Sequence, residues 1–132
     1  MESCIRSEKI DAMKAELTLL EGNIVKMIIK DEVHLEASDI REIAAAIQEL
    51  VSGCNHTVLL LAGKYTSISK EATEISANEE ISKNRFAKAI VTTSLAQRLM
   101  WNFFINLNVS SKPIKLFKEE SVAIEWLNGF TI

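Results

Sequence analysis

Hydroxyl side chains, which can bind an anion or accept a phosphate, gather at two points of the sequence. The first group is Thr66, Ser67 and Ser69, followed by Lys70; it comes after an apolar run and before a helix-like segment. A phosphate at the start of a helix is stabilised by free backbone N–H groups and by the helix dipole. The same serines can instead act as helix N-caps and satisfy one of those N–H groups themselves. This loop is therefore a candidate switch or anion-binding site, with simple capping as the alternative.

The second hydroxyl group, Thr92, Thr93 and Ser94, occupies the next strand-to-helix junction, where Ser94 and Gln97 predict a capping box. Neighbouring junctions of a parallel sheet lie at the same edge, where α/β proteins commonly bind ligands. We therefore expect the two groups to face each other, with Lys70 and Arg98 nearby, as a small anion or polar-ligand site. The alternative is two capped helix starts with nothing bound between them.

The sequence contains no recognisable catalytic or metal-binding motif. His34 and His56 stand apart from each other and from carboxylates or cysteines at metal-ligand spacing, so no metal site is expected. Nucleophile–base motifs, glycine-rich phosphate loops and Walker sequences are missing as well. We therefore expect a protein that is not an enzyme and that uses no cofactor.

The composition is that of a globular domain with its own core: 132 residues, 48% apolar, 25% charged, with a net charge of −3. This charge gives no reason to expect a nucleic-acid partner. No apolar run approaches the ~20 residues that span a bilayer, and residues 1–14 lack the apolar segment of a signal peptide. We expect a cytoplasmic protein without integral membrane contact, in which Cys4 and Cys54 are free thiols.

Apolar periodicity predicts an N-terminal arm over residues 1–13 and a single domain over residues 14–132. The order of elements, β-β-α-β-α-β-α-β-α, predicts an α/β fold with an open, mostly parallel, mixed five-stranded sheet. The unbroken apolar run Val58–Ala62 is typical of an interior strand. The predicted strands are 14–20, 24–30, 57–62, 86–92 and 112–117, and the predicted helices are 38–52, 70–80, 94–108 and 119–128.

The helix predicted at 94–108 carries apolar residues on two faces. The face expected to pack on the sheet contains Ala96, Leu99, Met100, Phe103, Phe104 and Leu107. Trp101 and Ile105 fall on the opposite face, with Arg98 beside them. Either the last helix or the N-terminal arm covers this pair, or the pair contacts a partner, since Trp and Arg are enriched at interfaces. Both readings stay open at the level of sequence.

Three segments of the chain resemble those of a known fold. They are VLLLAGKYTSISKEA (58–72), RFAKAIVTTSLAQRLMWNFFINLN (85–108) and KPIKLFKEESVAIEWL (112–127). Through them, residues 14–130 resemble the SpoIIAA-like fold, and more closely a family of small uncharacterised bacterial proteins described as STAS/SEC14-like. STAS domains have Asp-Ser-Ser-Gly where this chain has Ser69-Lys70-Glu71-Ala72. The serine that a kinase phosphorylates in STAS domains is missing here, so a kinase would have to use Ser67 or Ser69.

The resemblance implies a non-catalytic regulatory or protein-interaction module, whose partner is another copy of the chain or an unidentified protein. The alternative, implied by the SEC14-like members, is binding of a small apolar or lipid-like ligand; an enzyme is the third reading. An interaction module should show an apolar surface patch and no deep cavity. A ligand carrier should show an apolar pocket of ~300 Å³ or more, and an enzyme should show convergent titratable groups in a cleft.

Overall fold

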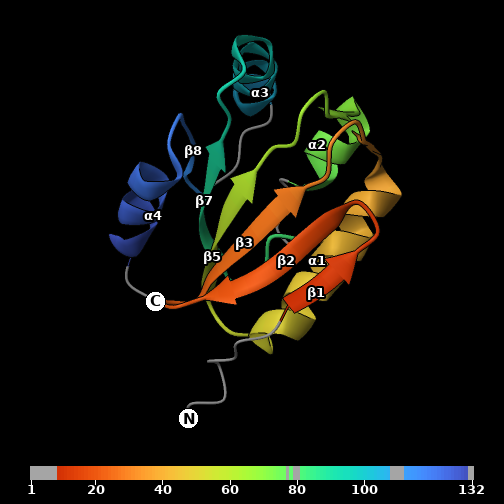
Figure 1. The fold of residues 1–132 in the computed structure, drawn as a ribbon. Helices are drawn as coiled ribbons and strands as arrows, with labels where there is room; N and C mark the ends of the chain where they lie inside the picture. The colour runs from red at the N-terminus through yellow and green to blue at the C-terminus, as the bar shows by residue number, and fades with distance from the viewer. Residues whose placement is uncertain (1–8, 77, 79–80, 108–111, 131–132) are drawn as a thin grey trace.

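A six-stranded mixed sheet forms the centre of the computed structural model, which describes residues 9–76, 78, 81–107 and 112–130 (Figure 1). The strand order is β1-β2-β3-β5-β7-β8. The first three strands of this order pair antiparallel, and β3, β5, β7 and β8 pair parallel. The predicted α/β class and the five predicted strands are confirmed. The strands are β1 (Lys9–Ala12), β2 (Ala15–Leu20), β3 (Ile24–Ile29), β5 (His56–Leu61), β7 (Arg85–Val91) and β8 (Ile114–Phe117).

The sixth strand, β1, comes from the segment that was expected to be an arm. Lys9–Ala12 pairs antiparallel with β2, from Lys9 opposite Thr18 to Ala12 opposite Ala15. Strand pairing satisfies backbone groups and needs no apolar periodicity, so the polar pattern of this segment gave no signal. Residues 1–8 of the predicted arm lie outside the described residues.

The helices cover the two faces of the sheet unequally. Helix α1 lies on one face and α4 on the other, while α3 lies beyond the ends of β5 and β7 (Figure 1). A small parallel pair, β4 (His34–Leu35) with β6 (Ser67–Ile68), precedes α1 and α2. The helices are α1 (Ala37–Val51), α2 (Lys70–Ser76), α3 (Leu95–Leu107) and α4 (Glu120–Asn128).

Strand β5 is buried on both sides, as the unbroken apolar run predicts. It lies between β3 and β7, so Val58–Leu61 belongs to the interior of the sheet. Val58 and Leu60 belong to the core beneath α1, whereas Leu59 belongs to the core beneath α4. Alternate residues of one strand thus hold both helix layers to the sheet.

The state of the cysteines differs from the expectation. Cys54 is disulfide-bonded, so the prediction of a free thiol is wrong. Disulfide pairing depends on which segments the fold brings together, and spacing along the chain does not show this. Cys4, the other of the two cysteines, lies outside the described residues. Because disulfides are typical of oxidising compartments, the cytoplasmic location stays a prediction.

The described helices are also too short or too polar to cross a membrane.

Candidate functional site

The two hydroxyl groups predicted from the sequence meet at one surface hollow. The hollow has a volume of about 550 Å³ and lies where β5 and β7 end. Thr66, Thr92, Thr93 and Ser94 all line it, but Ser67, Ser69, Lys70 and Arg98 do not. The parallel topology therefore places the two junctions together as expected, while the binding of an anion there stays a prediction. The lining residues are 62–66, 92–94, Ala96, Gln97 and Met100.

Gln97 joins the two junctions. Its Nε2 donates to the Gly63 carbonyl at 2.7 Å and to the Thr66 hydroxyl at 2.9 Å, and the Thr92 hydroxyl donates to its Oε1 at 2.8 Å. Only half of the predicted capping box forms: the Gln97 backbone N–H donates to Ser94 Oγ at 3.3 Å, while the Gln97 side chain crosses the hollow instead. The buried polar groups thus satisfy one another, which favours the alternative of two capped helix starts.

Ser67 and Ser69, the candidate switch residues, both have structural partners. Ser69 Oγ accepts from the Ala72 backbone N–H at 3.0 Å and caps α2. Ser67 Oγ lies 2.7 Å from His34 Nδ1, across the β4–β6 pair. Lys70 is exposed at the start of α2. Phosphorylation of Ser67 or Ser69 remains a prediction.

The contact of Ser67 with His34 extends to Glu36, an arrangement that the sequence did not reveal. His34 Nε2 lies 3.3 Å from Glu36 Oε2, so serine, histidine and glutamate form a chain like that of a catalytic triad. However, the His34 and Glu36 side chains are 51% and 57% exposed, and none of the three residues lines the hollow or the interior cavity described below. Catalysis by such a triad requires an enclosed site with hydrogen-bond donors that stabilise the developing oxyanion. We interpret these side-chain contacts as a structural link that holds β4 and β6 together.

Helix α3 faces the sheet with the opposite side from the one predicted. Trp101 is only 6% exposed, and Ile105 packs against the same core, so the predicted surface of Arg98, Trp101 and Ile105 is wrong. Arg98 is half-buried beside them. The reason is Gln97, because its hydrogen bonds to both junctions turn this side inward and Trp101 follows one helical turn later.

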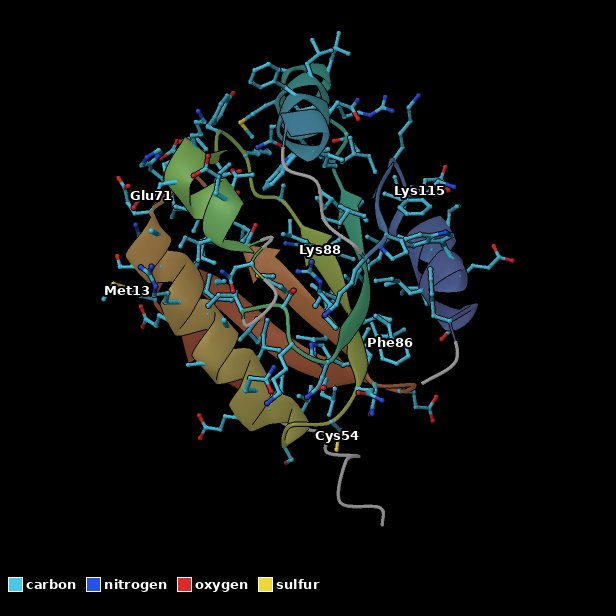
Figure 2. All side chains as sticks on the ribbon, turned by 180° about the vertical axis from the view of Figure 1, so that it is seen from behind. Met13, Cys54, Glu71, Phe86, Lys88 and Lys115 are labelled. Carbon is cyan, nitrogen blue, oxygen red and sulfur yellow. The ribbon has the colours of Figure 1, made fainter. Side chains whose placement is uncertain are left out.

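An interior cavity of about 60 Å³ lies between α1 and the sheet. Its walls are mostly apolar, but His56, Arg85 and Lys88 line it as well. Figure 2 shows Lys88 on the α1 side of the sheet. The sequence pattern does not reveal these three residues as a group, because His56 begins β5 whereas Arg85 and Lys88 belong to β7, which is distant in sequence.

A β-bulge brings the basic residues of the cavity together. His56 pairs with Arg85 and Val58 pairs with Lys88, so β7 has one more residue than β5 between these pairs. Arg85 and Lys88 consequently share a face. Burial lowers the pKa of Lys88 to about 7, helped by the charge of Arg85. Burial lowers the pKa of Arg85 only to about 10, so Arg85 is a buried cation at neutral pH.

Burial also lowers the pKa of His56. This effect outweighs the 3.0 Å hydrogen bond between its Nδ1 and the Cys54 carbonyl, which by itself raises the pKa. His56 is therefore the neutral member of the group at neutral pH.

Comparison with known proteins places the chain in a family. A family model described as "Domain of unknown function (DUF7793)" matches residues 18–131. The chain belongs to the DUF7793 family. This DUF7793 chain is similar to the crystal structure of an uncharacterised protein of the DUF3478 family with a SpoIIAA-like fold, from Shewanella loihica PV-4. The two share 13% sequence identity and a TM-score of 0.56, over 86% of this chain and 91% of that one.

The fold of this DUF7793 chain is therefore SpoIIAA-like, as the resemblance in the sequence implies. No curated protein matches the chain.

Proposed function

We propose that this protein is a non-catalytic protein-interaction module whose docking face is the outer side of α3. The observation that supports this is a row of three large apolar side chains, Leu95, Leu99 and Phe103, which are 69%, 63% and 60% exposed. They follow one another at intervals of one helical turn, so they form one stripe. A single exposed apolar residue is ordinary, but a contiguous apolar stripe is typical of an interaction site.

The surface next to this stripe also suits a partner. Ala96 and Met100 of α3 line the hollow, and Tyr65, which is 81% exposed, lines it from the loop after β5. At protein interfaces, aromatic residues that lie in or beside a pocket often contribute much of the binding energy. Burying each large side chain of the stripe would stabilise a complex by about 1.5–3 kcal/mol.

Binding of a lipid-like molecule, the alternative implied by the resemblance, receives less support. The interior cavity of about 60 Å³ is far smaller than the ~300 Å³ typical of a pocket for such a ligand. The hollow is larger, but its polar lining is occupied by the hydrogen bonds of Gln97. The partner we propose is a second copy of the chain or another protein.

Photo-crosslinking in the native host tests this function. A benzoylphenylalanine at position 99 should capture a partner, and the mass of the product tells a second copy from another protein. The same probe at Val122, which is 45% exposed on α4, serves as the matched control. Equal yields at positions 99 and 122, or no product from either, would contradict the proposal.

Sedimentation of purified protein provides the second test. If the partner is a second copy, the wild type should associate with rising concentration, and Leu99→Glu should stay monomeric with unchanged far-UV circular dichroism. Val122→Glu should associate like the wild type.

A further inference from the structure

One end of the interior cavity is basic, and some of its N–H groups have no hydrogen-bond partner among the described residues. Arg85 is 6% exposed, and no described residue accepts a hydrogen bond from its Nε or Nη2 atom. The same holds for Trp101 Nε1, which also belongs to the cavity lining. Buried N–H groups are almost always paired in folded proteins, so several unpaired donors at one cavity indicate that an acceptor belongs there.

The missing acceptor should be an anion. Lys88 is 9% exposed and lines the same cavity as Arg85. Among the described residues, no carboxylate forms an ion pair with either of them. The neighbouring groups His56 and Lys112 are also basic. A buried cation without a counter-charge is strongly unfavourable, whereas a cation that binds an anion through hydrogen bonds is not.

The rest of the cavity wall sets the size and the character of the ligand. Away from the basic end the wall is mostly apolar and includes Ile43, Ile47, Val58 and Leu60, with Gln48, Ser76 and Ser82 as polar members. At roughly 10–15 Å³ for each water-sized occupant, the cavity has room for about four to six non-hydrogen atoms. The planar fork of an arginine matches a carboxylate with two parallel hydrogen bonds.

We propose that the cavity binds a short-chain monocarboxylate. Its carboxylate accepts hydrogen bonds from Arg85 and Lys88, and its hydrocarbon tail lies against Ile43 and Ile47 of α1. Phosphate fits less well because it carries more negative charge, is strongly hydrated, and has no hydrocarbon tail that could contact the apolar wall. This site is distinct from the exposed apolar stripe of α3. A negative result for carboxylate binding therefore leaves the proposed interaction function untouched, and the reverse also holds.

Calorimetric titration with three matched probes tests the proposal on the full chain. Butyrate should bind saturably in the millimolar range. 1-Butanol has the same tail without the charge, and phosphate has charge without a tail; each should bind at least about tenfold more weakly. Absence of saturable butyrate binding up to roughly 50 mM would overturn the proposal and indicate a water-filled cavity. Phosphate binding as tight as butyrate would also overturn it.

Two substitutions separate the roles of charge and space. Lys88→Met removes a buried cation, keeps the volume, and should fold; it should weaken butyrate binding at least about tenfold. Ile47→Phe keeps both cations but fills the cavity, and it should abolish binding. Lys115→Met, at an exposed position of β8, is the control and should bind like the wild type. Unchanged binding in Ile47→Phe would place the anion elsewhere and refute the site.

A local signal checks that binding occurs at this cavity. The chain has two tryptophans, Trp101 and Trp126, so Trp126→Phe leaves only the cavity residue. Butyrate should change the emission of this variant with the same concentration dependence as the calorimetric signal. A calorimetric signal without any change in Trp101 emission would count against the cavity.

Discussion

Arg85 and Lys88 lie on the same face of β7, although residues at this spacing on a regular strand lie on opposite faces. The extra β7 residue opposite Thr57 produces this arrangement. As a result, two basic side chains enter the core beneath α1, where a regular strand would have placed only one of them. The fold bears a cost in stability at this point, and such costs are common where a protein binds a ligand.

The free energy of unfolding should rise with pH because of Lys88. Its pKa is about 7 in the folded protein and 10.5 when unperturbed. Below pH 7 the ammonium is charged in both states, and the cost of burying it is fully present. Between these two values only the unfolded chain holds the proton, so stability rises by up to about 1.4 kcal/mol per pH unit.

Urea unfolding at pH 7, 8 and 9 measures this slope in the wild type and in Lys88→Met. The variant should show a smaller slope, because the Lys88 ammonium no longer contributes to it. Lys115→Met should keep the wild-type slope. Parallel slopes for Lys88→Met and the wild type would show that Lys88 is not buried.

Trp101→Ala should destabilise the monomer rather than a complex. The buried indole is part of the core beneath α1, and its removal leaves a cavity that costs about 3–5 kcal/mol. Leu99→Ala on the exposed stripe should change the free energy of unfolding by less than about 0.5 kcal/mol. Denaturant unfolding gives both values. If the two variants lose equal stability, the described rotation of α3 is incorrect.

Gln97→Met should loosen the connection between the two strand-to-helix junctions. The substitution keeps the length of the side chain but removes its hydrogen bonds to the Gly63 carbonyl and to the Thr66 and Thr92 hydroxyls. The Thr66 hydroxyl still donates to the Gly63 carbonyl at 3.2 Å, so the loss of the three Gln97 bonds should cost about 1–3 kcal/mol. Ser94→Ala, which removes only the helix cap, should cost about 1 kcal/mol. Thermal unfolding compares them, and a smaller loss for Gln97→Met than for Ser94→Ala would contradict the bridging role.

Gly63→Ala should be severe because of backbone contact. A Cβ at this position would overlap the Ile29 carbonyl oxygen and lie 2.8 Å from the Lys30 carbonyl carbon. The end of β5 would have to move away from β3, which should cost about 3 kcal/mol. Gly53→Ala meets no described atom within 4 Å and has a φ of +73°, so its cost should be limited to about 1 kcal/mol of backbone strain. Urea midpoints of the two variants test the order.

Ser67 should be unreactive toward a fluorophosphonate probe, because its partner His34 and the Glu36 that contacts His34 are both exposed to solvent. Intact-mass spectrometry after incubation measures the labelling, with Ser67→Ala as the control. Stoichiometric labelling that disappears in Ser67→Ala would reveal an activated nucleophile and would contradict the non-catalytic function.

The sequence by itself determined most of the architecture. The apolar run Val58–Ala62 predicted an interior strand, and the alternation of strands and helices predicted a mostly parallel sheet. From that topology followed the meeting of the Thr66 and Thr92 loops. These features were predictable because they depend on local periodicity and on the direction of successive strands.

Only the tertiary structure decided which side of α3 faces inward, where the charges of the cavity lie, and that Lys9–Ala12 joins the sheet. Helix α3 is apolar on two sides, so its own pattern does not fix its rotation; the hydrogen bond of Gln97 to Gly63 does. The bulge between the His56 and Val58 pairs of β5 and β7 places Arg85 with Lys88. Each outcome depends on contacts between residues distant in the chain, and local patterns carry no information about those contacts.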